Sequence, residues 1–474
     1  MKIGFLAMSG IRAHDAKLLE LGLTLPGFVE RSKTIAQLPS LGLLYLAAVT
    51  PPGHDLAYYE AERDGAEPAE VYTCDLVAIS TFSAQVMEAY AIAGRLRAAG
   101  VKVAMGGLHV SVLPDEAARH ADYVIVGEGE NVWPAIVEHA DGDQSRIPDR
   151  GLRTEKGCGL PVIANPQSEI RNPKSIIVRS REFPPIDVAR LPVPRYDLLG
   201  DRPYNRFTVQ SSRGCPWRCD FCASTVMLAE KYRKRPVADV IRDIRAIMAV
   251  RERPFIEFAD DNTFVDKAWG KELCRQLIPL RLKWFTETDV TVADDPELLE
   301  LMHEAGCRQV LIGLESPTQG ALKGIEMHAD AKAKWADKYA ERVERIQRTG
   351  VTVNGCFILG LDGHTPRIFE DVLDFSVRHH LYDVQITILT AFPGTPLYAR
   401  LLKEGRILEP GRWELCTLFD VNYEPRGMSV AELREGMYWL TERLYSAECT
   451  EQRRGPFFAN LRRRGEGVTA GAIK

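Results

Sequence analysis

Three cysteines share one short stretch, Cys215-Pro-Trp-Arg-Cys219-Asp-Phe-Cys222, at the spacing C-x3-C-x2-C. The stretch follows a strand-like run, Phe207 to Gln210, so a loop leaving a strand end can turn the three thiolates inward onto one centre. Thiolates are the usual ligands of iron–sulfur clusters, and four cysteines hold the common cubane. Three cysteines leave one iron open to a substrate or a second cofactor. The stretch therefore predicts a [4Fe–4S] cluster held by Cys215, Cys219 and Cys222.

Two other uses of clustered cysteines fit this stretch less well. A zinc knuckle needs a fourth Cys or His ligand nearby, but the nearest cysteines are Cys158 and Cys274, and no histidine falls between Val209 and Glu230. A disulfide would leave one of the three cysteines without a partner. The spacing therefore favours the cluster over zinc or a disulfide.

With the aromatic Phe221 just before the third cysteine, the stretch resembles the signature of the radical S-adenosylmethionine (SAM) superfamily. The resemblance implies that the open iron chelates SAM and that Phe221 contacts it. It further implies that one electron, from a donor such as flavodoxin or ferredoxin, cleaves SAM to a 5′-deoxyadenosyl radical. In this superfamily a repeated strand–helix pattern follows the motif, so the rest of the chain tests the resemblance.

The chain after the motif repeats a strand–helix unit. Candidate strands are Phe207–Ser211, Phe255–Ala259, Trp284–Asp289, Gln309–Leu314, Val353–Leu359 and Val384–Leu389, separated by helical stretches such as Val237–Val250 and Pro296–Ala305. Six such units resemble the partial (β/α)6 barrel of radical SAM enzymes, and an open barrel admits a larger substrate than a closed one. The active site of such a barrel lies at the carboxyl ends of its strands.

Acidic and small polar residues follow several of these strands and suit a zwitterionic nucleoside. By resemblance, Asp260, Asp261 and Asn262 occupy the place of the Gly-Gly-Glu segment that holds the SAM amine in the superfamily. Glu315 and Ser316 match its G-x-E-S segment, which implies polar contacts to SAM. The alternative for each of these residues is helix capping at a strand–helix junction.

The first 145 residues also alternate strands and helices. Candidate strands are Lys2–Ala7, Asp55–Glu60, Asp75–Ser80, Val101–Met105 and Tyr123–Val126, with helices over Leu41–Ala48, over Ala84–Ala99 and from Asn131. This alternation predicts a doubly wound parallel sheet. In such a sheet a ligand sits beyond the carboxyl ends of the strands.

The loops after three of these strands are rich in glycine and small hydroxyl residues. They contain Ser80, Thr81, Gly106, Gly107, His109, Ser111, Gly127, Glu128 and Gly129. Glycines let a backbone approach a ligand closely, and hydroxyls supply hydrogen bonds. The alternative is that the glycines only form turns between strands and helices.

The same loops carry the motifs Gly-Gly-Leu-His and Gly-Glu-Gly-Glu, and the region resembles the cobalamin-binding domain that precedes many radical SAM modules. The resemblance implies that the nine loop residues bind cobalamin. No D-x-H-x-x-G motif supplies a histidine ligand for cobalt. The domain therefore either binds cobalamin without that ligand or has lost the cofactor.

Composition limits the other functions. The 474 residues are 45% hydrophobic and 26% charged, and the formal net charge is −5, so no overall basic field favours a nucleic-acid partner. Ten scattered cysteines and a first segment without a signal-peptide pattern indicate a cytoplasmic protein. The longest apolar run, Leu41 to Val49, is too short to span a bilayer, which takes about 20 residues.

We expect four segments: a cobalamin-binding-like domain over 1–145, a linker over 146–200, the partial barrel over 201–405 and a small helical region over 406–474. A capping signature, Ser429-x-x-Glu432, opens a helix in the last segment. The basic and aromatic ending around Phe457 and Phe458 is compatible with peripheral contact to an anionic membrane, and equally with a solvated helix face.

Together these features predict a cobalamin-dependent radical SAM enzyme. The resemblance implies that it methylates an unactivated carbon of a small-molecule or lipid substrate through the 5′-deoxyadenosyl radical and methylcobalamin. Two alternatives stay open: cyclisation or rearrangement with the same cofactors but no methyl transfer, and a non-catalytic iron–sulfur redox sensor. Methylthiotransfer to tRNA is disfavoured because it calls for a second set of three cysteines, and residues 1–150 contain only Cys74.

Overall fold

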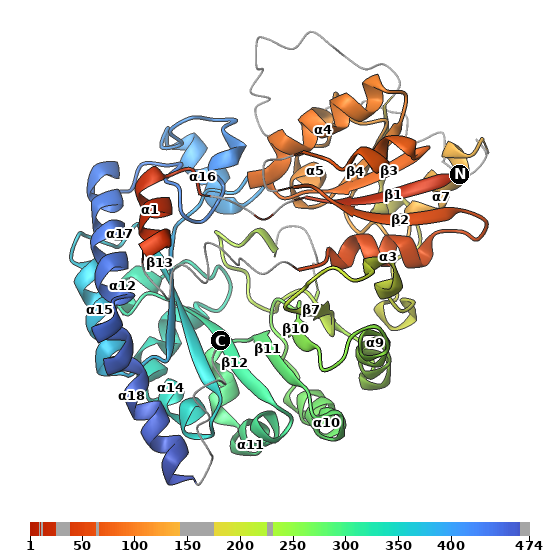
Figure 1. Ribbon diagram of the computed structural model, residues 1–474. Coiled ribbons are helices and arrows are strands. Elements are labelled where there is room, and N and C mark those ends of the chain that lie inside the picture. Colours follow the sequence, from red (N-terminus) through yellow and green to blue (C-terminus); the bar gives the residue numbers. More distant parts are fainter. Residues whose placement is uncertain are drawn as a thin grey trace.

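Strands and helices alternate along the chain and build two six-stranded sheets, the first above the second in Figure 1. The computed structural model describes residues 1–8, 10, 13–24, 38–62, 66–142, 175–224 and 231–464. Cys158 and the part of the predicted linker before residue 175 lie outside these ranges. The fold is the α/β architecture that the sequence predicts.

The N-terminal sheet is entirely parallel, with the strand order β2-β1-β3-β4-β5-β6. Its strands are β1 (Lys2–Ala7), β2 (Asp55–Glu60), β3 (Leu76–Ser80), β4 (Lys102–Gly106), β5 (Tyr123–Val126) and β6 (Ile176–Arg179). The accompanying helices are α3 (Leu41–Val49), α4 (Val86–Ala98), α5 (Leu108–Val112), α6 (Pro114–Ala117) and α7 (Trp133–Ala140). Helix α3 lies on the face toward the second sheet and α4 on the opposite face (Figure 1), so the predicted doubly wound sheet is confirmed.

Edge strand β6 comes from the stretch that the sequence predicts as a linker, so this sheet continues past residue 145. The inner strands are covered on both faces, so their sequences are continuous apolar runs without polar alternation. In β3, for example, each of the residues 76–79 is at most 2% exposed.

The second sheet is also entirely parallel and has the order β14-β13-β12-β11-β10-β7. Its strands are β7 (Phe207–Val209), β10 (Phe255–Phe258), β11 (Lys283–Glu287), β12 (Cys307–Glu315), β13 (Thr352–Leu359) and β14 (Asp383–Ile388), each within two residues of its predicted bounds. The helices are α9 (Val237–Val250), α10 (Lys267–Leu277), α11 (Pro296–Glu304), α12 (Gln319–Leu322), α13 (Ala331–Trp335), α14 (Tyr339–Arg348), α15 (Ile368–Arg378) and α16 (Pro396–Lys403). Because β7 and β14 are both edges, the sheet forms the predicted partial barrel.

Side chains alternate between the two sides of each barrel strand. On the outer side, under the helices, they are apolar and buried, as are Ile256, Trp284 and Ile312, each at most 1% exposed. On the inner side Glu257 is partly exposed and Glu287 is exposed. The partial barrel therefore encloses a lumen that contains polar groups.

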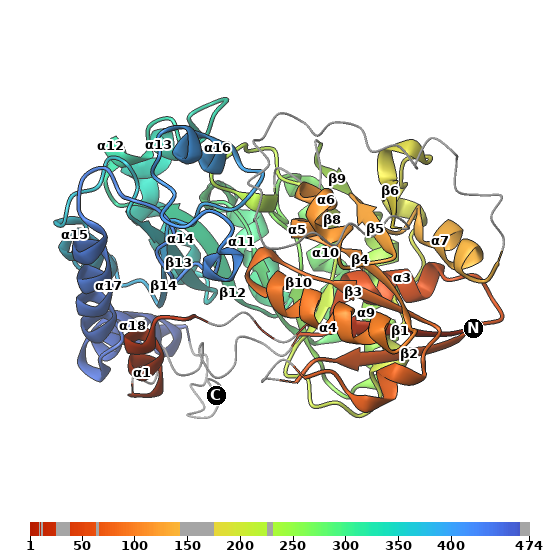
Figure 2. The ribbon, with the colours of Figure 1, turned by 90° about the horizontal axis from the view of Figure 1, so that it is seen from above.

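The chain ends in two helices, α17 (Val430–Leu444) and α18 (Ala447–Arg463), and the predicted capping box of Ser429 and Glu432 opens the first. Helix α1 (Ala16–Thr24) leaves the N-terminal sheet and packs beside α17 (Figures 1 and 2). Arg453 and Phe457 of α18 are buried, at 1% and 7% exposure, so they are not part of a surface patch. Their burial weakens the expectation of membrane contact. Within the described ranges, no helix combines the length and the apolar character needed to cross a bilayer.

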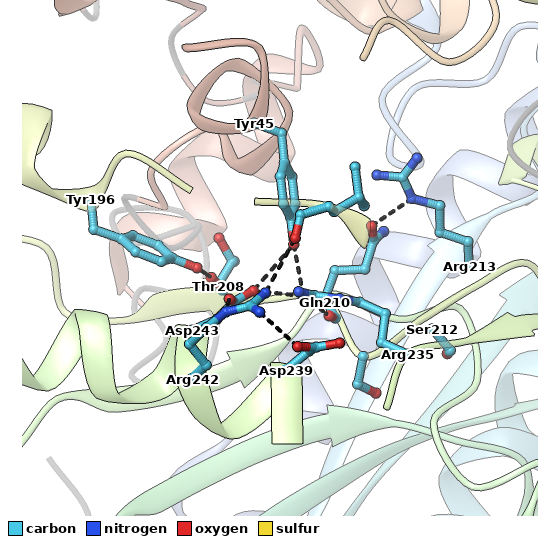
Figure 3. Close-up of polar contacts among 12 residues, drawn as sticks. Tyr45, Tyr196, Thr208, Gln210, Ser212, Arg213, Arg235, Asp239, Arg242 and Asp243 are labelled. Atoms are coloured by element: carbon cyan, nitrogen blue, oxygen red, sulfur yellow. Dashed lines mark hydrogen bonds and ion pairs between the residues drawn. The ribbon is translucent and has the colours of Figure 1, made fainter. Parts of the chain in front are cut away.

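A buried polar cluster joins the two sheets (Figure 3). Arg235, which follows β9 (Arg233–Lys234), lies 2.6 Å from Asp243 of α9 and donates a hydrogen bond of 2.8 Å to the hydroxyl of Tyr45 on α3. All three side chains are at most 1% exposed. Since a buried charge without its partner is costly, this contact fixes α3, and with it the N-terminal sheet, over the barrel.

Candidate active site between the sheets

The loop that carries the three cysteines begins directly after β8 (Ser212–Arg213), which pairs antiparallel with β9 further along the chain. It lies against the connection between α12 and α13. The amide of Asp220 donates to the carbonyl of Ile325 at 2.8 Å, and the amide of Met327 donates to the carbonyl of Arg218 at 2.9 Å. These bonds pair the cluster loop with residues 325–327 and hold it at the mouth of the barrel.

The three cysteine side chains lie close enough to affect one another electrostatically. Burial raises the pKa of the Cys215 thiol to about 11, and Asp261 and Cys222 add to that rise. Burial also raises the pKa of Cys219, which the ammonium group of Lys332 opposes and Cys222 and Cys215 reinforce. Metal binding requires thiolates, and the buried cation beside Cys219 would offset part of their charge. Lys332 therefore supplies a buried positive charge beside the residues predicted to hold the cluster.

Among the described residues, no three His, Cys, Asp or Glu side chains are grouped as ligands of a single metal ion. A cubane distributes its thiolates over different iron atoms, so its ligands do not have to meet at one point. The arrangement of Cys215, Cys219 and Cys222 is thus compatible with the predicted cluster and does not form a mononuclear zinc site.

The tryptophan between the first two cysteines connects the loop to two strand ends. The indole N–H of Trp217 donates to Asp289 at 2.9 Å, and the side-chain amide of Asn262 donates to the same carboxylate at 2.8 Å. Buried Asn262 also accepts from the hydroxyl of Thr288 at 3.1 Å. Asn262 therefore supports the cluster loop through Asp289, and its predicted contact with SAM stays a prediction.

Asp260 is buried at 4% exposure and uses both carboxylate oxygens inside the protein. It accepts from the amides of Ser211 and Ser212 at 2.8 and 2.9 Å, from the hydroxyl of Ser211, and from the hydroxyl of Thr263 at 2.9 Å. These bonds tie the approach to the cluster loop to the end of β10. They favour a positioning role for Asp260 over direct contact with SAM.

Two other predicted SAM contacts, Asp261 and Phe221, flank the cysteines and are each only partly buried. Asp261 accepts from the amide of Gly214 at 3.1 Å and is close enough to raise the pKa of Cys215. Phe221 packs against the hydrophobic core. Both residues are better placed than Asp260 to meet a ligand at the cluster.

Glu315 ends β12 in a left-handed backbone conformation, with φ of +62°. Its carboxylate lies 2.9 Å from the ammonium group of Lys332, which also donates to the carbonyl of Gly313 at 2.6 Å. A side chain at Gly313 would collide with Glu315, because an added Cβ would lie 2.3 Å from Oε1. Strain of this kind persists where the surrounding structure enforces it and is concentrated at functional sites. The structure thus brings Glu315 to the cluster loop, next to Cys219.

Ser316 is fully buried and hydrogen bonded to His364. His364 accepts from the amide of Leu361 through Nδ1 at 3.2 Å, so its Nε2 carries the proton and donates to Ser316 at 3.0 Å. Burial lowers the pKa of His364 to about 4, which keeps the ring neutral. Ser316 therefore belongs to a structural contact, and its predicted bond to SAM stays a prediction.

The lumen of the barrel holds a further carboxyl group among the acidic residues that the sequence places at the strand ends. Glu287, at the end of β11, is reached by solvent although protein surrounds it. Burial raises its pKa from the usual 4.5 to about 7, and the nearby acids Glu257, Asp261 and Asp260 raise it as well. This side chain lies on the inner face of the barrel, where a substrate would enter.

A cavity of about 250 Å³ opens at the carboxyl ends of the N-terminal strands. Its lining from this sheet includes Ser80, Gly106, Gly107, Gly127, Glu128 and Gly129, all predicted cobalamin contacts. Gln210, Arg213 and Ala259 line it from the barrel, and α3 contributes Leu41, Gly42, Leu43, Tyr45 and Leu46. The cavity therefore lies between the domains, and its size suits a part of a cobalamin molecule, not the whole.

Glycine is required at position 107 of this cavity wall. Gly107 has φ of +102°, and an added Cβ would lie 2.5 Å from the carbonyl oxygen of Thr81. Ser111 joins two of the glycine loops, because its hydroxyl donates to the carbonyl of Gly107 and accepts from the amide of Gly127, both at 2.9 Å. Ser111 thus holds together the two loops whose glycines, Gly107 and Gly127, line the cavity.

Three predicted cobalamin contacts do not line the cavity: Thr81, His109 and Ser111. His109 is 1% exposed, and its ring nitrogens lie 3.1 Å from the hydroxyl of Ser83 and 3.2 Å from Glu116. The indole of Trp413 packs edge-on against the ring at 5.3 Å. With both nitrogens engaged, His109 offers cobalt no ligand in this conformation. Its role here is to join the sheet to the C-terminal region.

Arg213 is the functional candidate that sequence reasoning missed. It lies two residues before Cys215 and pairs with Glu128 at 2.8 Å and with Glu130, both in the glycine-rich loop after β5. Arg233 also pairs with Glu128. The two acids stand in the quoted Gly-Glu-Gly-Glu motif, but no sequence signal tells which arginine they meet.

Comparison with known proteins places these features in a family. The radical SAM superfamily profile matches residues 209–376, and the B12 binding domain profile matches residues 33–137. Bacteriochlorophyllide d C-12(1)-methyltransferase of Chlorobaculum tepidum is 22% identical over 418 residues, which cover 87% of this chain and 84% of the relative. Hopanoid C-2 methylase of Rhodopseudomonas palustris is 28% identical over 379 residues, or 79% of this chain and 66% of the relative.

Among solved structures, the cobalamin-dependent SAM radical enzyme OxsB with aqua-cobalamin and SAM bound has the same fold. It aligns with a TM-score of 0.63 at 13% identity, over 98% of this chain and 71% of that chain. A partial barrel with a three-cysteine loop, joined to a doubly wound sheet with glycine-rich strand ends, defines a radical SAM protein with a second cofactor domain. With both profiles matched, the chain belongs to the radical SAM enzymes that carry a cobalamin-binding domain.

Proposed function

We propose that this enzyme transfers a methyl group to an unactivated carbon of a small-molecule or lipid substrate. The observation that carries the proposal is the shared wall of the two cofactor sites. The cavity behind Gly107 and Gly127 is also lined by Gln210 and Arg213, which lead directly into the cluster loop. A methyl donor in one domain and a radical generator in the other would then adjoin one substrate.

When bound, the cluster, SAM and cobalamin supply an electron, a hydrogen-abstracting radical and a methyl group. The protein's share is to position these groups and to exclude water. Cys215, Cys219 and Cys222 would hold the cluster, and Lys332 would offset part of the thiolate charge. Asp261 and Glu315 are the predicted polar contacts to SAM that lie beside the cysteines. The glycine loops would receive part of the cobalamin.

The lumen supports a bulky substrate with a few polar groups. The barrel is open between β7 and β14, and its inner face combines Phe285, Glu257 and Glu287. Two of the relatives have printed names that state an action on bacteriochlorophyllide and on hopanoids. We therefore infer a largely apolar small molecule or lipid, oriented by hydrogen bonds to the lumen carboxyl groups.

The enzyme would act in a reducing compartment such as the cytoplasm. Within the described ranges, no cysteine forms a disulfide with another. Free thiols persist where glutathione and thioredoxin keep them reduced, and a radical generator needs a supply of low-potential electrons. A small electron-carrier protein is the partner that this chemistry requires.

The test is anaerobic reconstitution with iron, sulfide and cobalamin, followed by incubation with methyl-deuterated SAM, dithionite and a lipid extract. The proposal predicts 5′-deoxyadenosine together with a product that has gained a deuterated methyl group, detected by mass spectrometry. Deoxyadenosine with an altered but unlabelled product would indicate cyclisation or rearrangement instead. A reconstituted cluster that yields no deoxyadenosine would contradict a catalytic role.

A further inference from the structure

The outer side of the cluster loop forms an exposed surface of mixed cationic and apolar character. We call it the cluster-loop surface and define it by Arg218, Lys323, Met327, His328 and Lys334, each exposed. The backbone bond from Met327 to Arg218 places the two segments side by side. The surface therefore lies directly outside the loop that holds the three thiols.

Acidic groups near this surface are mostly turned inward. Glu326 is 2% exposed, and its carboxylate accepts from the amides of Arg218, His328, Ala329 and Ala331 at 2.7 to 3.3 Å. Asp330 accepts from the amide of Gly324 at 3.0 Å and is partly buried. Asp337, three residues after Lys334, is exposed. The surface is thus locally positive on a chain whose formal net charge is −5.

An exposed apolar side chain stands among these cations. Met327 is 47% exposed, one of a small number of large hydrophobic residues that are exposed within the described ranges. Methionine and arginine are enriched at protein interfaces, from which lysine is usually depleted. Just inside, Trp335 at the end of α13 meets Trp217 of the cluster loop edge-on, with ring centroids 5.0 Å apart. Aromatic rings therefore connect this side of the molecule with the stretch between Cys215 and Cys219.

We propose that the cluster-loop surface is the docking site of a small acidic electron-carrier protein. The proposal rests on the proposed function, which needs one external electron for each SAM cleaved. The inner side of the loop faces Asp261, Glu315 and the lumen, where SAM and substrate would lie, so the outer side is left for the donor. Redox encounters use small interfaces, and opposite charge raises their association rates.

The electron transfer balances without a proton or a bond change at the cluster. An anionic flavin hydroquinone of the carrier would lose one electron and become the neutral semiquinone. A cluster held by Cys215, Cys219 and Cys222 would take up that electron and pass from the 2+ to the 1+ state. The carrier then dissociates and is reduced again elsewhere.

The test measures cluster reduction by anaerobic stopped-flow absorbance, with reduced flavodoxin as the protein donor and dithionite as the small-molecule donor. The variant is Lys323→Glu with Lys334→Glu. The matched control is Arg253→Glu with Lys283→Glu, which reverses two exposed charges next to the amino-terminal ends of β10 and β11, away from the cluster loop. At low salt we expect the rate with flavodoxin to fall about ten-fold or more in the first variant. The control should keep the wild-type rate.

Dithionite separates the possible outcomes. Unchanged reduction by dithionite together with slow reduction by flavodoxin supports the docking site. Equal flavodoxin rates in the wild type and the variant overturn it, as does a wild type that only dithionite reduces. If the double variant loses its cluster, Met327→Asp replaces it in the experiment. Slow reduction by flavodoxin with unchanged reduction by dithionite then supports the docking site, and an unchanged flavodoxin rate overturns it. Loss of deoxyadenosine formation with dithionite in the wild type would contradict the proposed function, independently of docking.

A cationic surface could also bind nucleic acid, and the same proteins test this. A labelled single-stranded oligonucleotide that binds the wild type, but not the Lys323→Glu, Lys334→Glu variant, would assign the surface to that partner. That result, with flavodoxin rates unchanged, would overturn the proposal. The expected result is no binding at physiological salt.

Discussion

The guanidinium group of Arg213 lies 2.8 Å from the carboxylate of Glu128, although Arg213 leads into the cluster loop and Glu128 lies in the loop after β5 of the N-terminal sheet. Glu130 pairs with the same arginine, and both Arg213 and Glu130 are less than 10% exposed. The position of the cluster loop is therefore linked to the loops predicted to bind cobalamin. A change in the position of either loop should therefore alter the position of the other.

Replacing this arginine should destabilise the protein and weaken cobalamin binding. Arg213→Met leaves two largely buried carboxylates, of which only Glu128 keeps a partner, Arg233. Breaking such a buried pair costs about 3–5 kcal/mol. We expect a lower midpoint of urea unfolding and less cobalamin retained after gel filtration.

The control for this variant is Arg195→Met, which breaks an exposed pair with Asp197. Exposed pairs contribute about 0–1 kcal/mol, so this variant should unfold close to the wild type and keep its cobalamin. Equal unfolding midpoints for the two variants would show that the contact between the domains contributes little.

The cluster assignment is tested by removing one thiol inside the motif and one outside it. Cys219→Ala should lose the visible absorption of a thiolate-held cluster, together with most of the bound iron and sulfide. Cys274→Ala removes a fully buried thiol of α10. This variant should keep the visible absorption, the iron and the sulfide. Iron and sulfide analysis after anaerobic reconstitution decides the matter. Full content in Cys219→Ala would show that this residue is not a ligand.

The periodic part of the fold could be read from the sequence. The apolar strands of the barrel and their spacing by helices predict its six strands, β7 and β10 to β14, within two residues. The capping box at Ser429 and the glycine loops at Gly107 and Gly127 were recognised for the same reason, because local patterns determine local structure. Strand β6 was missed because it is only four residues long and lies in a stretch rich in proline and arginine.

The side-chain roles at the site were harder to predict. His109 and Asp260 were expected to contact cofactors, yet each is buried and hydrogen bonded within the protein. A sequence shows that a polar residue follows a strand, but not which distant partner it meets. Arg213 and Glu128 are 85 residues apart, and Tyr45 and Asp243 are 198 apart. Such contacts depend on how the two sheets pack together, and no local pattern encodes them.

Cobalamin binding should depend on the absence of a side chain at Gly107. Gly107→Ala would place Cβ 2.5 Å from the carbonyl of Thr81, at a backbone φ of +102°. The loop would have to move, and the cavity wall with it. We expect the variant to retain little corrin after reconstitution with hydroxocobalamin, measured by the visible absorption of the purified protein.

Gly53→Ala is the matched control, because Gly53 has a similar φ of +92° and open space around an added Cβ. It carries the backbone strain alone, about 1–2 kcal/mol, and should retain corrin like the wild type. If both variants bind corrin equally well, the wall at Gly107 does not contact the cofactor.

The lumen carboxyl group of Glu287 should make stability depend on pH. Its pKa is raised from 4.5 to about 7, first by burial and then by Glu257, Asp261 and Asp260. Between these two values the folded protein binds a proton that the unfolded chain has released, so stability falls as the pH rises through this window. Glu287→Gln stays neutral and removes the effect. The difference in melting temperature, variant minus wild type, should therefore increase from about pH 5 to about pH 8.

Glu297→Gln is the matched control, because the pKa of Glu297 is shifted in the opposite direction to that of Glu287. The pKa of Glu297 is lowered, chiefly by its hydrogen bond to Lys271, so its carboxylate favours folding above the usual pKa. For Glu297→Gln, the melting temperature of the variant minus that of the wild type should stay near zero or decrease from about pH 5 to about pH 8. A flat profile for Glu287→Gln, or one that follows Glu297→Gln, would mean that the carboxyl group at the end of β11 is solvated like a surface acid. The lumen would then not be the enclosed space that its neighbouring acids indicate.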